Sequence, residues 1–303
     1  MNLDAARVSL RRMNAPAKPS AEDRRARKAM RREKQRAANP VRAEAMHKAR
    51  LADLYAGAPR GDAAPACNIG CSGWFYWDWK GLFYPAQMAT QDWFGYYADR
   101  FDTVELNAPF YSWPTVNAVK GWLRQAGERD FVYTVKVSEL ITHVRRFEDV
   151  KGLVADFGYI ADLLGERMGC FLFQFPASFD YTPERLARIV AQLEPRRRNV
   201  VEFRHASWWN AAVHDAFRDH GVIFCATSGP NLPDAVVKTA DEIYVRFHGP
   251  ERWYRHDYAD AELADWARRI RDSGARRVWA YFNNDYNGFA IRNAETLRRM
   301  LKG

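Results

Sequence analysis

The sequence predicts a single (β/α)₈ barrel over residues 67–303, preceded by a basic N-terminal segment. After residue 67, short apolar and β-branched runs typical of buried strands recur eight times and alternate with segments of helical pattern. Strands that alternate with helices form a parallel sheet, and eight such units over about 240 residues fit a closed barrel. A doubly wound open sheet is the alternative. No glycine-rich nucleotide fingerprint follows the first strand, so the barrel is favoured.

The predicted elements are evenly placed along the chain. The strands are 68–72, 103–107, 131–137, 170–175, 199–205, 222–228, 242–248 and 277–283. The helices are 90–100, 116–126, 149–164, 183–193, 210–220, 260–273 and 287–302. Start signals such as Thr182 followed by Pro183, and stop signals such as Gly165, support several helices. The interval 229–241 is too short for a long helix, and none is predicted there.

Residues 1–66 differ from the rest of the chain in composition and charge. Of the 46 Lys and Arg residues, 16 lie in residues 1–60, against 6 of the 37 Asp and Glu residues, so the remainder is nearly neutral. Residues 21–54 contain good helix formers but few large apolar side chains, so we expect a disordered or loosely helical, solvated extension that cannot fold alone. Residues 58–65 are typical of a linker. The segment is either an arm that contacts nucleic acid or an acidic partner, or a solubilising extension, or the product of a start codon assigned too early.

The chain has no run of 18 apolar residues and no apolar signal segment at its N-terminus, so we expect a cytoplasmic protein that does not cross a membrane. The four cysteines are expected to be buried, reduced thiols. Cys67 and Cys71 lie four residues apart on one strand, roughly 13 Å, which is too far to share a metal ion or a disulfide.

Polar side chains close all eight predicted strands, and in a barrel of this kind the chemistry lies at the C-terminal ends of the strands. Residues two apart on a strand face the same side, which applies to Glu202 with Arg204 and to Arg246 with His248. The candidate residues are Ser72, Glu105, Asn107, Lys136, Gln174, Glu202, Arg204, His205, Arg246, His248, Asn283, Asn284 and Asp285. Together they predict a polar cavity, although a purely structural charge network would use the same residue types.

Acid–base chemistry suits this residue set best. A divalent metal is an alternative through the acidic side chains and His205 or His248, but the neighbouring Lys136 and Arg246 would repel it, and no ligand-spacing motif is present, so no cofactor is predicted. Ser72 lacks a nucleophile elbow. The predicted catalytic residues are Glu202 as proton shuttle, His248, Lys136, Glu105 and Asp285. The predicted substrate-binding residues are Ser72, Asn107, Gln174, Arg204, His205, Trp208, Arg246, Asn283 and Asn284. Aromatic residues that follow strands one, two, five and seven are expected to frame the mouth, mostly by packing of long loops.

Several blocks of sequence resemble those of the DUF72 family, also called YecE-like. They are Ile-Gly-Cys-Ser-Gly-Trp-Phe-Tyr-Trp-Asp-Trp-Lys-Gly-Leu-Phe-Tyr-Pro (69–85), Phe-Asp-Thr-Val-Glu-Leu-Asn-Ala-Pro-Phe-Tyr (101–111), Phe-Gln-Phe-Pro-Ala-Ser-Phe (173–179), Val-Glu-Phe-Arg-His-Ala-Ser-Trp (201–208), Val-Arg-Phe-His-Gly (245–249) and Tyr-Phe-Asn-Asn-Asp (281–285). The resemblance covers residues 68–301 and implies a TIM barrel, but no settled activity and therefore no catalytic role. Cys71 and Ala108 depart from the small hydroxyl residue expected there. A likeness to metal-dependent nucleic-acid repair barrels is an analogy of fold alone.

Three functional hypotheses follow. The first is an acid–base enzyme, a hydrolase or lyase that needs no metal and acts on a small anionic or polyhydroxylated substrate. The second is a nucleic-acid-processing barrel, endonuclease-like and metal-assisted, that the basic residues 1–60 help to bind its substrate. The third is a non-catalytic metabolite-binding protein. The oligomeric state is left open.

Overall fold

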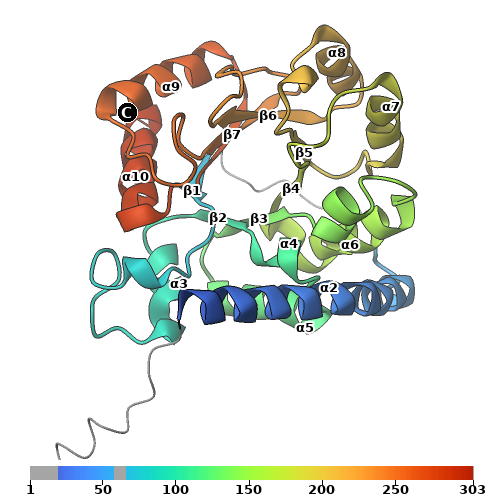
Figure 1. Cartoon of the computed structure of the whole chain (residues 1–303), viewed down its shortest axis with the longest axis horizontal. Helices are drawn as coiled ribbons and strands as arrows, with labels where there is room; N and C mark the ends of the chain where they lie inside the picture. The colour runs from blue at the N-terminus through green and yellow to red at the C-terminus, as the bar shows by residue number, and fades with distance from the viewer. Residues whose placement is uncertain (1–19, 58–65, 303) are drawn as a thin grey trace, which may run out of the picture.

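A computed structural model describes residues 20–57 and 66–302 of the chain. Residues 1–19, and the predicted linker 58–65, lie outside the described residues. Eight parallel strands close into a barrel with helices around it, which confirms the predicted (β/α)₈ fold (Figure 1). The strands are β1 (Cys67–Cys71), β2 (Thr103–Leu106), β3 (Val132–Lys136), β4 (Met168–Gln174), β5 (Asn199–Glu202), β6 (Ile223–Ser228), β7 (Glu242–Phe247) and β8 (Arg277–Phe282).

All eight predicted strands are present, and most of their ends agree with the prediction to within two residues. The exception is β5, which ends at Glu202 although the pattern predicted a strand to His205. Beyond Glu202 the chain bends, and the Arg204 side chain turns back so that its Nε lies 2.6 Å from a carboxylate oxygen of Glu202. The ion pair is therefore made between a strand end and the bend that follows it.

The seam between β1 and β2 is bridged by a side chain. The Tyr97 hydroxyl accepts a hydrogen bond from the Cys71 N–H (2.9 Å) and donates one to the Thr103 carbonyl (3.0 Å). Gly70 permits the close approach of the two strands, because a Cβ at this position would lie 2.4 Å from the Thr103 carbonyl oxygen.

The predicted helices are found between the strands, and a short additional helix follows β2. They are α3 (Trp93–Ala98), α4 (Ala108–Tyr111), α5 (Val116–Ala126), α6 (Lys151–Leu164), α7 (Pro183–Gln192), α8 (Ala211–Asp219), α9 (Asp260–Asp272) and α10 (Phe289–Lys302). The predicted helix start at Thr182 is confirmed, since its side chain accepts the Arg185 N–H. The interval 229–241, all of it described, contains no helix, as predicted.

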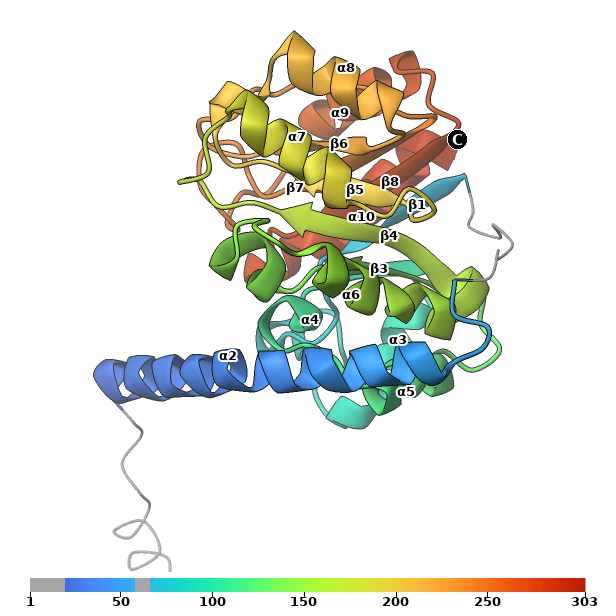
Figure 2. The same ribbon diagram turned by 90° about the vertical axis from the view of Figure 1, so that its right-hand side faces the viewer.

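The basic extension forms one continuous helix, α2 (Ala21–Ala52), that packs along the outside of the barrel (Figure 2). The expected helical tendency is confirmed, but the helix is docked and not merely solvated. Asn39, Ala43 and Met46 are buried against the barrel. His47 and Arg50 both reach Asp156 on α6, at 2.9 Å each. These polar contacts help to hold the helix against the barrel, which the few apolar residues of the segment could not do alone.

The barrel interior is apolar in its lower part and polar toward the C-terminal ends of the strands. Cys170, Leu172, Val200, Cys225 and Trp279 belong to the apolar cluster inside the barrel. All four cysteines are free thiols, and only Cys67 is partly exposed. The polar part above this cluster forms the floor of the site described next.

Candidate functional site

A cavity of about 980 Å³ opens at the C-terminal ends of the strands. Loops after most of the strands contribute to its wall, as expected for a barrel of this class. It is lined by Tyr76, Asn107, Tyr111, Lys136, Gln174, Pro176, Ala177, Arg204, His205, Ala206, Pro230, Asn231, Arg246, Trp253, Tyr254, Asn283 and Asp285.

Arg246 on β7 holds the floor of this cavity together. Its Nε and Nη2 donate to the two carboxylate oxygens of Glu105 at 2.9 and 2.5 Å, a bidentate pair, and its Nη1 donates to Glu202 at 2.6 Å. The Tyr244 hydroxyl also donates a hydrogen bond to Glu105, at 2.6 Å. All of these side chains are almost fully buried. Burial opposes the charge on Arg246, but Glu105 and Glu202 raise its pKa well above the usual value.

Glu202 is the centre of a second set of contacts. Burial would raise its pKa, but Arg204 and Arg246 hold that pKa well below its ordinary value, so the group remains a carboxylate. His248 is buried beside it, with Nε2 2.9 Å from Arg204 Nη2 and Nδ1 3.2 Å from the Asn283 amide nitrogen. Burial, followed by Arg204 and Arg246, lowers the pKa of His248 well below its usual value, so the imidazole is neutral.

Lys136 at the end of β3 stands apart from this network. Its Nζ lies 4.0 Å from the centre of the Phe110 ring, and the residue is 9% exposed. Among the described residues, no carboxylate lies within ion-pair distance of it. Burial, and secondly the charge of Arg246, lower the pKa of Lys136 to about 7. The cavity wall therefore holds an amine that can take up or release a proton near neutral pH.

Asp285 follows β8 at the same rim. Its Oδ1 is buried and accepts no hydrogen bond from the residues that the structure describes. Burial raises the pKa of Asp285 to about 7, against the opposing effect of Tyr76. Two groups that line one cavity thus share the same titration range, although one is a base and the other an acid.

The structure brings most of the predicted site residues to one rim. Those that line the cavity are Asn107, Lys136, Gln174, Arg204, His205, Arg246, Asn283 and Asp285. Glu105, Glu202 and His248 lie beneath them and contact lining residues. Ser72 lies at the edge, where its carbonyl accepts the Asn107 amide.

Two of the predicted binding residues face the core and not the cavity. Trp208 is fully buried, stacked on Phe203 with ring centres 3.9 Å apart, and its indole N–H donates to the Phe179 carbonyl. Asn284 is buried, and its amide donates to the His256 carbonyl and to Asn293. Their prediction as cavity residues is wrong, because an aromatic ring and an amide that follow a strand can equally well anchor the loop from below.

The sequence profile of the family described as "Protein of unknown function DUF72" matches residues 68–303. The chain belongs to the DUF72 family. The UPF0759 protein YunF of Bacillus subtilis (strain 168) is 25% identical over 269 residues, which cover 77% of this chain and 94% of that protein. A DUF72 family protein from Thermotoga maritima MSB8, solved by crystallography, is 29% identical with a TM-score of 0.71, and the match covers 79% of this chain and 100% of that one. A second crystal structure, a DUF72 family protein from Enterococcus faecalis V583, shares the fold at 19% identity and a TM-score of 0.67, over 78% of this chain and 96% of that one.

Helix α2 lies outside the DUF72 match, yet it supports the cavity wall. Asn39 on α2 donates to the Tyr111 carbonyl at 3.3 Å and accepts the Trp113 N–H at 2.9 Å, so it fixes the loop that presents Tyr111. The Arg32 guanidinium lies 4.0 Å from the centre of the Tyr111 ring. Arg32 and Arg36 also pair with the buried Glu139, three residues beyond β3. Sequence reasoning missed this support, because the partners are more than 70 residues apart and no local pattern links them.

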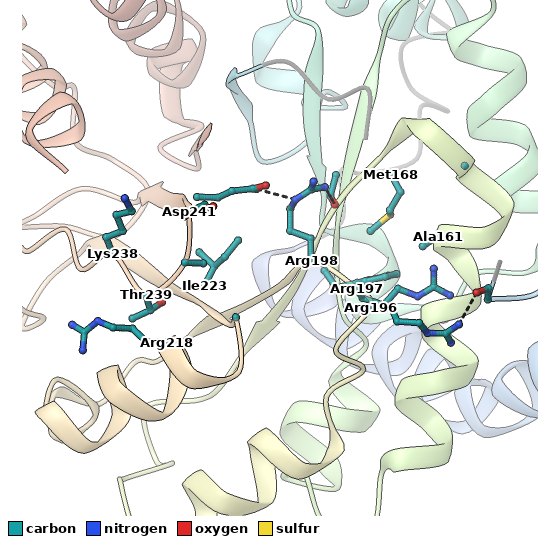
Figure 3. Close-up of a pocket in the computed structure, with 17 residues that line it drawn as sticks. Ala161, Met168, Arg196, Arg197, Arg198, Arg218, Ile223, Lys238, Thr239 and Asp241 are labelled. Carbon is teal, nitrogen blue, oxygen red and sulfur yellow. Dashed lines mark hydrogen bonds and ion pairs between the residues drawn. The ribbon is translucent and has the colours of Figure 1, made fainter. Parts of the chain in front are cut away.

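A second cavity, also of about 980 Å³, opens at the opposite, N-terminal face of the barrel. Figure 3 shows Arg218 and Lys238 on one side of it and Arg196, Arg197 and Arg198 on the other. These cations already have partners within the protein, including Asp215 for Arg218, the Gly274 carbonyl for Lys238 and Glu242 for Arg198. In TIM barrels the chemistry lies at the C-terminal face, so we interpret these paired charges on the N-terminal face as stabilising.

Residues 20–57 and 66–302 contain neither a cluster of metal-ligand side chains nor a membrane-spanning helix. No group of three or more His, Cys, Asp or Glu side chains in this part of the chain gathers as a metal site would require. No helix in the same residues is long and apolar enough to cross a membrane.

Proposed function

We propose that this DUF72 protein is an acid–base enzyme, a lyase or hydrolase, that acts on a small anionic substrate in the cavity at the C-terminal rim. The observation that carries the proposal is Lys136: a buried amine with no carboxylate partner among the described residues, placed in the wall of an open cavity. A fold that needed only a structural cation would pair it, as it pairs Arg246.

In this proposal the proton carriers are Lys136 and Asp285. The sequence predicted Glu202 as the proton shuttle, but Glu202 is held as a carboxylate between Arg204 and Arg246. In this proposal its role is to orient those two cations. The neutral Lys136 amine takes a proton from the substrate in an elimination, or from the attacking water in a hydrolysis, and the protonated Asp285 carboxyl gives one to the leaving group. Arg204 and Arg246 line the cavity, where guanidinium N–H groups can donate hydrogen bonds to the anionic group of the substrate, and Asn107 and Asn283 line the same wall.

The scheme has a specific pH dependence. Lys136 must be deprotonated, which is lost as the pH falls below about 7, and Asp285 must be protonated, which is lost as the pH rises above about 7. The rate should therefore follow a narrow bell with its maximum near pH 7, in which each limb reports one group.

The test begins with a thermal-shift screen of small phosphorylated and carboxylated compounds, followed by turnover assays on those that bind. Lys136→Met and Asp285→Asn should each lower turnover by at least 100-fold, and Lys120→Met on the exposed surface of α5 should leave it unchanged. Turnover that survives both site variants refutes the assignment. A ligand that binds and is recovered unchanged supports the metabolite-binding alternative.

A further inference from the structure

The N-terminal third of α2 extends beyond the barrel. Every residue from Ala21 to Arg31 is exposed, and the first contact with the barrel is made by Arg32. Figure 2 shows these turns projecting past the barrel on the side toward which the β4 arrow points, which is the side of the cavity. Eleven helical residues at 1.5 Å each span about 16 Å.

The basic residues of this segment are sorted onto two faces. At 100° per residue, Arg32 and Arg36 fall on one side, where they pair with Glu139. The adjoining side, centred about 120° away around the helix axis, carries a stripe spaced three or four residues apart, within an arc of about 120°. We call it the basic stripe; it consists of Arg27, Lys28, Arg31 and Lys34.

No described residue neutralises the basic stripe through an ion pair. Arg27, Lys28, Arg31 and Lys34 are exposed and form no ion pair with any described residue. Like charges three or four residues apart repel one another and weaken a helix. The stripe is therefore retained at a cost to the helix that a bound polyanion would remove.

We propose that the basic stripe of α2 binds the phosphate backbone of a single-stranded nucleic acid. From Arg27 to Lys34 the four cations span about 10 Å of the helix axis, which is roughly one cation per 3.5 Å. A DNA strand with stacked bases carries one phosphate per ~3.4 Å of its axis, so the two linear charge densities match. An isolated small anion would contact only one or two members of such a row.

An aromatic ring beside the helix favours a single strand over a duplex. Tyr111 lies under Arg32, next to the edge of the basic stripe, and is 44% exposed. Single-strand sites combine a row of cations with rings on which unpaired bases stack. This inference goes beyond the proposed function: it concerns a partner of α2 and holds whether or not the cavity is catalytic.

The test measures the binding of a fluorescein-labelled 20-nucleotide oligothymidylate to the full chain by anisotropy, between 50 and 200 mM salt. A stripe variant replaces four cations with glutamine, a good helix former: Arg27→Gln, Lys28→Gln, Arg31→Gln and Lys34→Gln. A control variant removes four exposed cations elsewhere: Lys120→Gln, Arg124→Gln, Arg276→Gln and Arg299→Gln.

The stripe variant should bind at least tenfold more weakly at 100 mM salt, and its plot of log K against log salt should be shallower by about 3, at ~0.7 per lost phosphate contact. The control should bind within twofold of the wild type. The proposal is overturned if the wild type shows no salt-dependent binding, if the stripe variant binds like the wild type, or if the control loses as much. Binding to phosphatidylserine vesicles without binding to the oligonucleotide would overturn it in favour of a membrane surface.

Discussion

Replacing Lys136 with methionine should make the protein more stable. The lysine is buried beside Arg204 and Arg246, and the burial lowers its pKa from 10.5 to about 7. An unfolded chain holds the proton on this amine up to about pH 10.5, so folding below that pH means either burying a charge or releasing a proton. Methionine keeps the length of the side chain and can contact the Phe110 ring without that cost.

The sign and size of the effect follow from the two pKa values. Between about pH 7 and 10.5 the unfolded state binds more protons than the folded state, so the stability of the wild type rises with pH across this window. At about 1.36 kcal/mol for each tenfold step, the penalty carried by Lys136 is roughly 4 kcal/mol at pH 7 and about 2 kcal/mol at pH 9. Lys136→Met should therefore gain that much free energy of unfolding, with the gain halved at the higher pH.

Urea unfolding at pH 6, 7, 8 and 9 measures this gain, with Lys120→Met on the surface as the matched control. The control should show a difference from wild type below about 0.5 kcal/mol at every pH. A Lys136→Met protein that is less stable than the wild type at pH 7, or a gain that does not shrink by pH 9, would refute the picture of an unpaired buried amine.

Three further results are expected. Asp285→Asn should raise the free energy of unfolding by about 2 kcal/mol above pH 7 and have little effect near pH 4, because a raised carboxyl pKa costs stability only where the unfolded carboxyl is ionised. The expected gain is smaller than the full pKa shift implies, because the carboxyl lies beside an open cavity that solvent can enter. Urea unfolding at both pH values measures it. Arg246→Met should destabilise by about 3–5 kcal/mol because two buried carboxylates lose their partner, and Arg246→Lys should recover little of this, since one ammonium cannot replace three directed N–H bonds; thermal unfolding distinguishes the two. Asn39→Ala should speed hydrogen exchange at the Trp113 N–H, which bonds to Asn39, by tenfold or more, and should leave exchange at the Cys71 N–H unchanged. If exchange at the Trp113 N–H is the same in the variant and the wild type, α2 does not hold the loop.

The barrel was predictable because its signal is local and repeated. Each strand is a short apolar run that ends in a polar residue. The location of the site follows from the same logic, since parallel strands end at one rim. Strand parity does not account for the pairing of Glu202 with Arg204, because β5 ends at Glu202 and the bend beyond it returns the Arg204 side chain toward it. The alternation of side chains along one strand does not predict which carboxylates are neutralised by cations and which face the cavity, because that depends on neighbours from several strands.

The failures have the same origin. Trp208 was expected at the mouth because it follows a strand end, but its ring is fully buried and stacks on Phe203. Helix α2 was expected to be solvated because its own apolar content is small. It docks through partners such as Glu139 and Asp156, and those contacts are not visible in the composition of either segment.

The floor of the cavity is electrically balanced, and this makes the remaining two groups decisive. Two carboxylates and two guanidinium groups cancel there, so the local net charge is set by Lys136 and Asp285. Below about pH 7 Lys136 and Asp285 are both protonated, and this group of six side chains carries one positive charge. Above about pH 7 both are deprotonated, and the same group carries one negative charge. The pocket thus reverses polarity within the physiological range, and an anion that enters it draws a proton in with it.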